Sequence, residues 1–132
     1  MTAFYQWIGY DPIESPHMPE DAMKLIKCIV RPNKVDEVKD ALGKINIAGM
    51  TVTEVRGHDK QKGHTAIYRG QEYNVSLPPK MEIELVVPDQ VVDDVVKAII
   101  QAARTGEIGD GRVFVMPVDR SYRIRTGEME LA

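Results

Sequence analysis

The residues best suited to chemistry in this sequence of 132 residues form a candidate anion-binding set in its last third. The segment 105–112 reads TGEIGDGR, and its glycines can offer backbone N–H groups to an anion without side-chain obstruction. Arginine binds phosphate through two parallel hydrogen bonds, so a glycine turn with three arginines would suit a triphosphate. An ordinary turn with solvated surface arginines is the alternative. The set comprises Gly109, Gly111, Arg112, Arg123 and Arg125.

A second candidate feature is a long connection between two strand-like segments, Thr51–Arg56 and Lys80–Val87. Hairpin loops usually contain about two to five residues, so residues 57–79 are better explained by a role in binding than by the needs of the fold. We expect Tyr73 to be exposed near the tip, because its neighbours are polar. Lys80 follows the connection directly and is either a solvated strand-end residue or a partner for a carboxylate.

These features need a framework, and the hydrophobic pattern predicts six elements in the order β-α-β-β-α-β. The order is that of the ferredoxin-like α+β fold, a four-stranded antiparallel sheet with two helices on one face. We expect Asn33 and Asp89 to cap the two helices, and the residues after Pro117 to be irregular. The predicted elements are a strand at 24–31, a helix from 33 to about 46, strands at 51–56 and 80–87, a helix at 89–103 and a strand at 112–117.

The first strand carries apolar residues on both sides, which bears on the assembly of the protein. Ile26, Cys28 and Val30 alternate with Leu25 and Ile29. A monomer would leave one apolar sheet face in water, so we expect the chain to oligomerise through that face. Cys28 is the only cysteine and is expected to be a buried, inert thiol.

Composition and motifs exclude several classes of function. A net charge of −3 gives no reason to expect nucleic-acid binding. No apolar run approaches the roughly twenty residues of a membrane span, and the start lacks the pattern of a signal peptide, so we expect a cytoplasmic protein.

The sequence has no P-loop, no metal-site spacing and no Ser/His/Asp set. A regulator is therefore favoured over an enzyme. The enzyme alternative, a small phosphohydrolase that uses the arginines, lacks an evident general base.

Residues 1–22 differ from the rest of the chain. They hold half of the aromatic residues, namely Phe4, Tyr5, Trp7 and Tyr10, together with four acidic residues and no Lys or Arg. Idle tails are usually poor in aromatics, so we expect this extension to dock onto the body or onto a partner. A disordered leader ahead of a domain at 23–132 is the alternative.

Three separated motifs resemble those of the PII signal-transduction family, the nitrogen-regulatory GlnB/GlnK proteins. They are QKGHT at 61–65 with YRGQEY at 68–73, TGEIGDGR at 105–112 and RIRTGE at 123–128. The first corresponds to the family's T-loop, which carries a modifiable tyrosine. The resemblance implies a homotrimer with three clefts between subunits, each of which binds ATP or ADP.

The resemblance also implies roles for individual residues. The modified tyrosine would be Tyr73, and the group attached to it would be a uridylyl or an adenylyl group. The effector 2-oxoglutarate and a Mg²⁺ ion would be bound with ATP by Gln61, and Lys80 would pair with the 2-oxoglutarate carboxylate. Implied targets are an ammonium transporter, a glutamine-synthetase-modifying enzyme or a sensor kinase. The implied nucleotide-binding residues are Thr51, Gly57, Gly109, Gly111, Arg112, Arg123 and Arg125.

Some positions depart from the family pattern. Asp59 replaces a glycine, which adds a carboxylate beside the implied 2-oxoglutarate site. A PII-like nucleotide sensor that has lost or altered its 2-oxoglutarate response is therefore the alternative function. Arg112 stands where lysine is more usual and should preserve phosphate binding. The family begins near Met23, so the resemblance assigns no role to residues 1–22.

Overall fold

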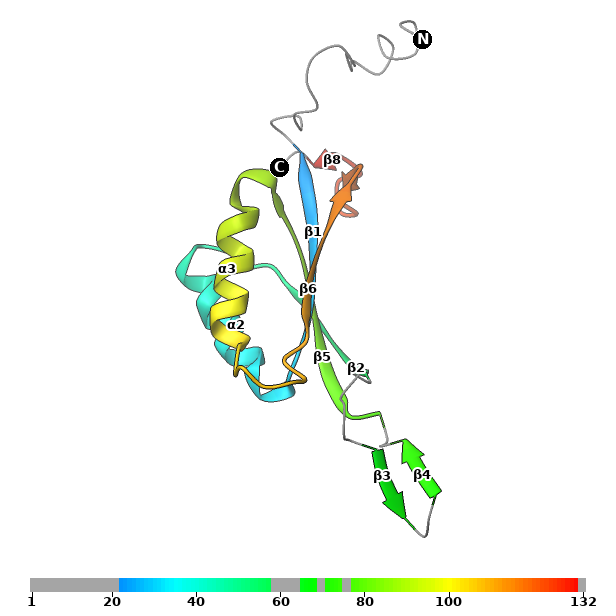
Figure 1. The fold of residues 1–132 in the computed structure, drawn as a ribbon. Helices are drawn as coiled ribbons and strands as arrows, with labels where there is room; N and C mark the ends of the chain where they lie inside the picture. The colour runs from blue at the N-terminus through cyan, green and yellow to red at the C-terminus, as the bar shows by residue number, and fades with distance from the viewer. Residues whose placement is uncertain (1–21, 58–64, 69–70, 75–76, 131–132) are drawn as a thin grey trace, which may run out of the picture.

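The structure is a computed structural model and describes residues 22–57, 65–68, 71–74 and 77–130. It contains eight strands, two α-helices and two short 3-10 turns within these residues (Figure 1). The strands of the main sheet are β1 (Met23–Val30), β2 (Thr51–Arg56), β5 (Pro79–Pro88) and β6 (Arg112–Val118). The helices are α2 (Val35–Lys44) and α3 (Val92–Ala103), and the 3-10 turns are η1 (Pro32–Lys34) and η2 (Asp89–Val91).

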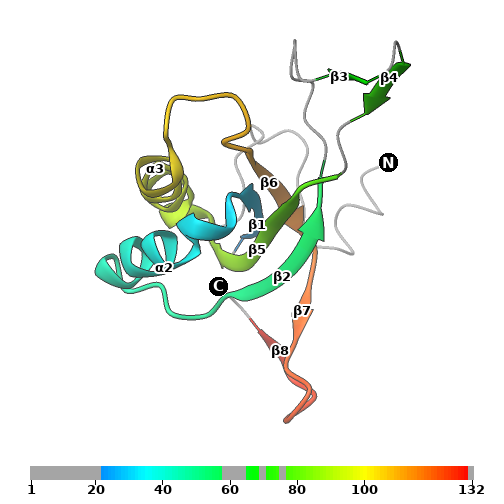
Figure 2. The same cartoon turned by 90° about the horizontal axis from the view of Figure 1, so that it is seen from below.

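The main sheet has the strand order β2-β5-β1-β6, and every neighbouring pair is antiparallel. Both helices cover the same face of this sheet (Figure 2). This arrangement confirms the predicted ferredoxin-like fold. The strand bounds agree with the sequence prediction to within one residue at nearly every end, because Pro32 and Pro88 mark clear limits.

The core lies between the sheet and the helices. Ile26, Cys28 and Val30 of β1 are buried and lie against buried side chains of both helices, as the alternation of this strand predicts. Burial raises the pKa of the Cys28 thiol to about 11, which keeps it protonated and unreactive. The helix residues of the core are Val38, Leu42, Val95, Ile99 and Ala103.

The predicted helix caps are wrong. Asn33 lies inside η1 and Asp89 begins η2, and neither side chain makes a capping hydrogen bond. In each case a 3-10 turn stands between the strand and the α-helix. The residue before each 3-10 turn, Arg31 or Pro88, has an extended backbone, and the tight turn takes the place of a side-chain cap.

Two segments predicted to be irregular contain strands. The long connection includes β3 (Thr65–Tyr68) and β4 (Gln71–Asn74), which pair as an antiparallel hairpin. The C-terminal segment includes β7 (Ser121–Tyr122) and β8 (Met129–Glu130), which pair likewise. These strands have two to four residues each, too few for a hydrophobic period to be recognised in the sequence.

No helix among the described residues covers the second face of the sheet. Lys27 lies on this face between two glutamates of β5, with its ammonium 3.1 Å from Glu82 and 3.7 Å from Glu84. Phe114 of β6 stands opposite Lys27 on the other side and is 41% exposed, and Val86 is 49% exposed. An exposed apolar surface around paired charges is the feature from which the sequence predicts oligomerisation, which stays a prediction.

Candidate functional site

The candidate site is built around the connection between α3 and β6, residues 104–111, which we call the glycine turn. Its carbonyl groups are held by two cations from the sheet. Arg31 donates from Nη2 to the carbonyl oxygen of Ile108 at 3.0 Å, and Lys80 donates from Nζ to that of Gly109 at 2.9 Å. In a trans peptide group the N–H points opposite to the C=O. The N–H groups of Gly109 and Asp110 therefore point away from these cations.

The N–H of Gly109 is not donated to another backbone group among the described residues, whereas the N–H of Asp110 closes the tight turn over Ile108 and Gly109 and points toward the carbonyl of Glu107. Gly109 and Gly111 both have positive φ, at 101° and 95°, a conformation that glycine adopts without a steric penalty. Successive N–H groups in such a turn can form a concave anion-binding nest. The anion site at the glycine turn stays a prediction.

Asp110 fixes the other half of the turn. Its carboxylate accepts hydrogen bonds from the backbone N–H groups of Thr105 and Gly106, both at 2.9 Å, and from the hydroxyl of Thr105. It also accepts a hydrogen bond from Nε of Arg31 at 3.3 Å. The hydroxyl and backbone hydrogen bonds, with the nearby guanidinium, hold the pKa of this carboxyl well below its usual range. Asp110 is therefore ionised throughout the physiological range.

Lys80 links the glycine turn to the base of the long connection. Its residue is only 8% exposed, and its side-chain stem lies 3.6 Å from the position that a Cβ at Gly57 would occupy. Gly57, the first residue after β2, donates its N–H to the carbonyl of Pro78 at 3.2 Å. Gly57, Lys80 and Gly109 are therefore neighbours. Lys80 is therefore not a solvated lysine, and it forms no ion pair with a carboxylate of the described residues.

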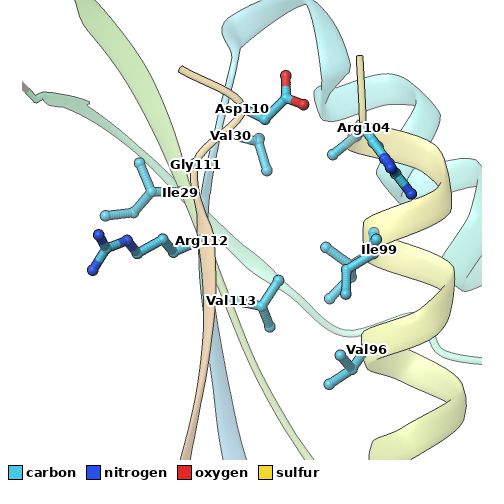
Figure 3. A pocket seen from close by; sticks show the side chains of 11 residues that line it. Ile29, Val30, Val96, Ile99, Arg104, Asp110, Gly111, Arg112 and Val113 are labelled. Atoms are coloured by element: carbon cyan, nitrogen blue, oxygen red, sulfur yellow. The ribbon is translucent and has the colours of Figure 1, made fainter. Parts of the chain in front are cut away.

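A cavity of about 280 Å³ lies between α3 and the start of β6 (Figure 3). Val96, Ile99 and Val113 face one another across it, whereas the guanidinium of Arg112 points to the opposite side of β6, beside Ile29. Arg112 is exposed and makes no ion pair with another described residue. Its charge therefore lies beside the glycine turn, on the side of β6 that faces away from α3.

Three other predicted site residues lie elsewhere in the chain. Thr51 begins β2 and is exposed, at the far end of this strand from Gly57. Arg123 and Arg125 follow β7, and β6 separates them from Arg112 by about 20 Å of strand. Figure 1 shows β8 at the opposite end of the sheet from the glycine turn. One subunit therefore does not bring the three arginines together.

Arg123 and Arg125 occupy a well-defined hairpin. Arg123 pairs through Nε with Glu130 at 3.0 Å, and its carbonyl accepts the N–H of Gly127 at 2.7 Å. Arg125 is exposed and has no ion-pair partner among the residues that the structure describes. A second subunit would have to supply such arginines to any site that combines them with the glycine turn.

Gln61 and Asp59 lie outside the described residues, as does the extension 1–21. The backbone of Tyr73 is part of β4, and its side chain is not among the described groups. The roles predicted for these residues therefore stay predictions.

The sequence prediction missed Arg31 and Asp110. Arg31 was seen only as the end of a strand, although 77 and 79 residues separate it from its two partners. Asp110 lies within the glycine turn, and the short spacing from Thr105 to an Asx residue was a local signal of a side chain that bonds to backbone.

The strand order and helices define a ferredoxin-like domain, and comparisons with known proteins identify its family. The family model described as "Nitrogen regulatory protein P-II" matches residues 23–128. The P-II 1 protein of Escherichia coli K12 is 57% identical over 106 residues, which cover 80% of this chain and 95% of that protein. The P-II protein of Haemophilus influenzae is 55% identical over 106 residues, with the same coverage.

A structural neighbour supports the assignment. The crystal structure of Arabidopsis thaliana PII bound to citrate has a TM-score of 0.67 and 39% identity, and covers 86% of this chain and 91% of that one. The chain belongs to the nitrogen regulatory P-II family. Members of this family are named as regulatory proteins and not as enzymes. Within the described part of the chain, no helix has the length and apolarity needed to cross a membrane.

Proposed function

We propose that this chain is a homotrimeric P-II sensor that binds ATP or ADP and 2-oxoglutarate in the cytoplasm and regulates nitrogen-metabolism targets through the long connection, its T-loop. One observation carries the proposal. The nest at Gly109 and Asp110 is joined through Lys80 to the base of the T-loop. A ligand bound at the nest would therefore act on the peptide group whose carbonyl Lys80 holds on the other side.

The nucleotide would place its phosphates on N–H groups of the glycine turn, with Arg112 on the sheet side. Arg123 and Arg125 of a neighbouring subunit would complete the charge, because their own chain holds them about 20 Å from the turn. Thr51 and Gly57 would contact the nucleoside. Association through the open sheet face would form such a shared site and cover Phe114.

The Mg²⁺ ion would bind together with the nucleotide. Mg²⁺ prefers oxygen ligands and is usually held by phosphates with one or two protein groups. The amide oxygen of Gln61 is a ligand of this type, and a 2-oxoglutarate carboxylate would add others. Lys80 has three N–H donors, of which Gly109 uses one, so the same ammonium could also pair with that carboxylate.

Regulation would follow from linkage between ligand and loop. A ligand that binds one conformation of the loop base better than another shifts the loop population toward it, and targets that prefer one conformation read the shift. Candidate targets are an ammonium transporter, a glutamine-synthetase-modifying enzyme or a sensor kinase. A nucleotidyl group on Tyr73 would add bulk and charge to the loop and block a close interface.

Equilibrium titration with ATP and ADP tests the nucleotide part of the proposal, with Arg112→Ala as the weakened variant. Binding of neither nucleotide would reject it. Binding of nucleotide without any effect of 2-oxoglutarate would favour the alternative, a P-II-like nucleotide sensor with an altered response. The carboxylate of Asp59, which replaces a family glycine, is the feature that favours this alternative.

A further inference from the structure

The glycine turn has no regular secondary structure, yet side chains fix at least four of its backbone groups. Asp110 accepts the N–H groups of Thr105 and Gly106, Arg31 holds the carbonyl of Ile108 and Lys80 holds that of Gly109. Three glycines lie within the turn, and glycine loses more conformational freedom on ordering than any other residue. The side-chain contacts therefore select one conformation from many.

Arg31 restrains both sides of Gly109 with one guanidinium. Its Nη2 holds the Ile108 carbonyl at 3.0 Å while its Nε lies 3.3 Å from the Asp110 carboxylate. A guanidinium can do this because its donors form a rigid planar fork, whereas a lysine ammonium is a single point of charge. Arg31 directly follows β1, so the main sheet supports the restraint.

A carboxylate within an anion site would ordinarily repel the ligand, which makes Asp110 the instructive residue. Here its oxygens are directed to Thr105, Gly106 and Arg31, so its charge is compensated inside the turn. The backbone N–H of the same residue closes the tight turn over Ile108 and Gly109. The carboxylate and the backbone of Asp110 thus both hold the turn, and the negative charge stays inside it.

We propose that Arg31 and Asp110 are positioning residues for anion binding, which hold the peptide groups of the glycine turn in the one conformation that binds the phosphates. The inference deepens the proposed function and rests on it for the identity of the ligand. Neither side chain needs to touch the ligand. By ordering the turn in advance, they reduce the conformational entropy that would otherwise be lost when the ligand binds.

The test compares Asp110→Asn and Arg31→Ala with Lys97→Ala, which removes an exposed cation from α3, outside the glycine turn, and has no ion pair with Asp110 or Arg31. The intact protein is titrated with ATP, and with inorganic tripolyphosphate while the amide resonances of Gly109 and Asp110 are followed. We expect affinities about tenfold or more lower for both ligands in the two positioning variants, and unchanged in the control.

A second pair keeps the test valid if either variant fails to fold. Thr105→Val removes the hydroxyl that donates to Asp110, and Thr105→Ser retains it. Thr105→Val should weaken tripolyphosphate binding and Thr105→Ser should not, with equal melting temperatures excluding a general loss of structure. Wild-type affinity in the positioning variants, or equal losses in the control, would overturn the inference. Absence of ATP and tripolyphosphate binding by the wild-type protein would instead reject the proposed function.

Discussion

The ammonium of Lys80 donates a hydrogen bond to the carbonyl oxygen of Gly109 at 2.9 Å, although 29 residues separate them in the chain. Lys80 is the second residue of β5, directly after the long connection, and Gly109 lies in the turn that precedes β6. This contact is the shortest physical link between the base of the loop and the candidate phosphate site. It gives a structural reason for ligand and loop to influence each other.

Replacing Lys80 by methionine should therefore affect both stability and binding. Methionine retains most of the apolar stem but leaves the Gly109 carbonyl without its donor, at a cost of about 1.5–3 kcal/mol in the free energy of unfolding. We also expect weaker ATP binding, because the peptide group after Gly109 loses its restraint. Urea unfolding and calorimetric titration measure the two effects. Lys97→Met on the exposed side of α3 is the control, and an equal change there would contradict the role of Lys80.

Gly111 is a glycine of the turn at which an added side chain would collide with β1. Its φ is +95°, and a Cβ would lie 1.7 Å from the carbonyl oxygen of Ile29 in β1. Gly111→Ala should therefore lower the free energy of unfolding by about 3 kcal/mol or more, through backbone strain and displacement of β6. Gly106→Ala is the matched control, because its φ is +89° but nothing lies within 4 Å.

Thermal and urea unfolding of both alanine variants separate strain from collision. Gly106→Ala should lower the free energy of unfolding by only about 1–2 kcal/mol, because only the left-handed backbone conformation is unfavourable there. Equal losses at the two positions would show that the close approach of Gly111 to β1 is unimportant.

Asp110 should make stability depend on pH in the acid range. Its pKa in the folded protein lies below the unfolded value of about 3.9, so the ionised carboxylate stabilises the fold at every pH above that value. This stabilisation is lost as the pH falls through the lower, folded pKa. Asp110→Asn should therefore be less stable than wild type at pH 7, and the difference should shrink below about pH 4. Urea unfolding at several pH values measures it, and a difference independent of pH would contradict the assignment.

Phe114 tests the proposed assembly. It is 41% exposed on the sheet face that no described helix covers, whereas its neighbour Val115 is 42% exposed and points to the other side of β6. If the open face joins the subunits, Phe114→Glu places a charge in the interface and should give monomers, while Val115→Glu should not. Sedimentation equilibrium distinguishes the species. A Phe114→Glu protein with the mass of the wild-type assembly would reject this interface.

The sequence predicted the frame of this protein better than its details. Alternation in β1 and the prolines after it identified strand, buried face and boundary, because burial and the lost N–H of proline act locally. The helix caps were mistaken at Asn33 and Asp89, since a capping residue type does not reveal that a 3-10 turn has taken its place.

The candidate site was predicted in part, for a similar reason. Glycines in the turn signal their own backbone freedom, so Gly109 and Gly111 could be found from the sequence. The restraint by Arg31 depends on a contact across 77 residues, which only the fold creates. The burial of Lys80 likewise depends on its neighbours in space, so a strand-end lysine and a buried one look alike in the sequence.

The most direct test of the proposed function is calorimetric titration of 2-oxoglutarate into the full-length protein, first with Mg-ATP and then with Mg-ADP. The account predicts saturable binding with Mg-ATP and little or none with Mg-ADP, because in the proposal the ATP phosphates and Gln61 would together hold the metal ion. ATP binding with no response to 2-oxoglutarate in either case would contradict a role as a sensor of this metabolite.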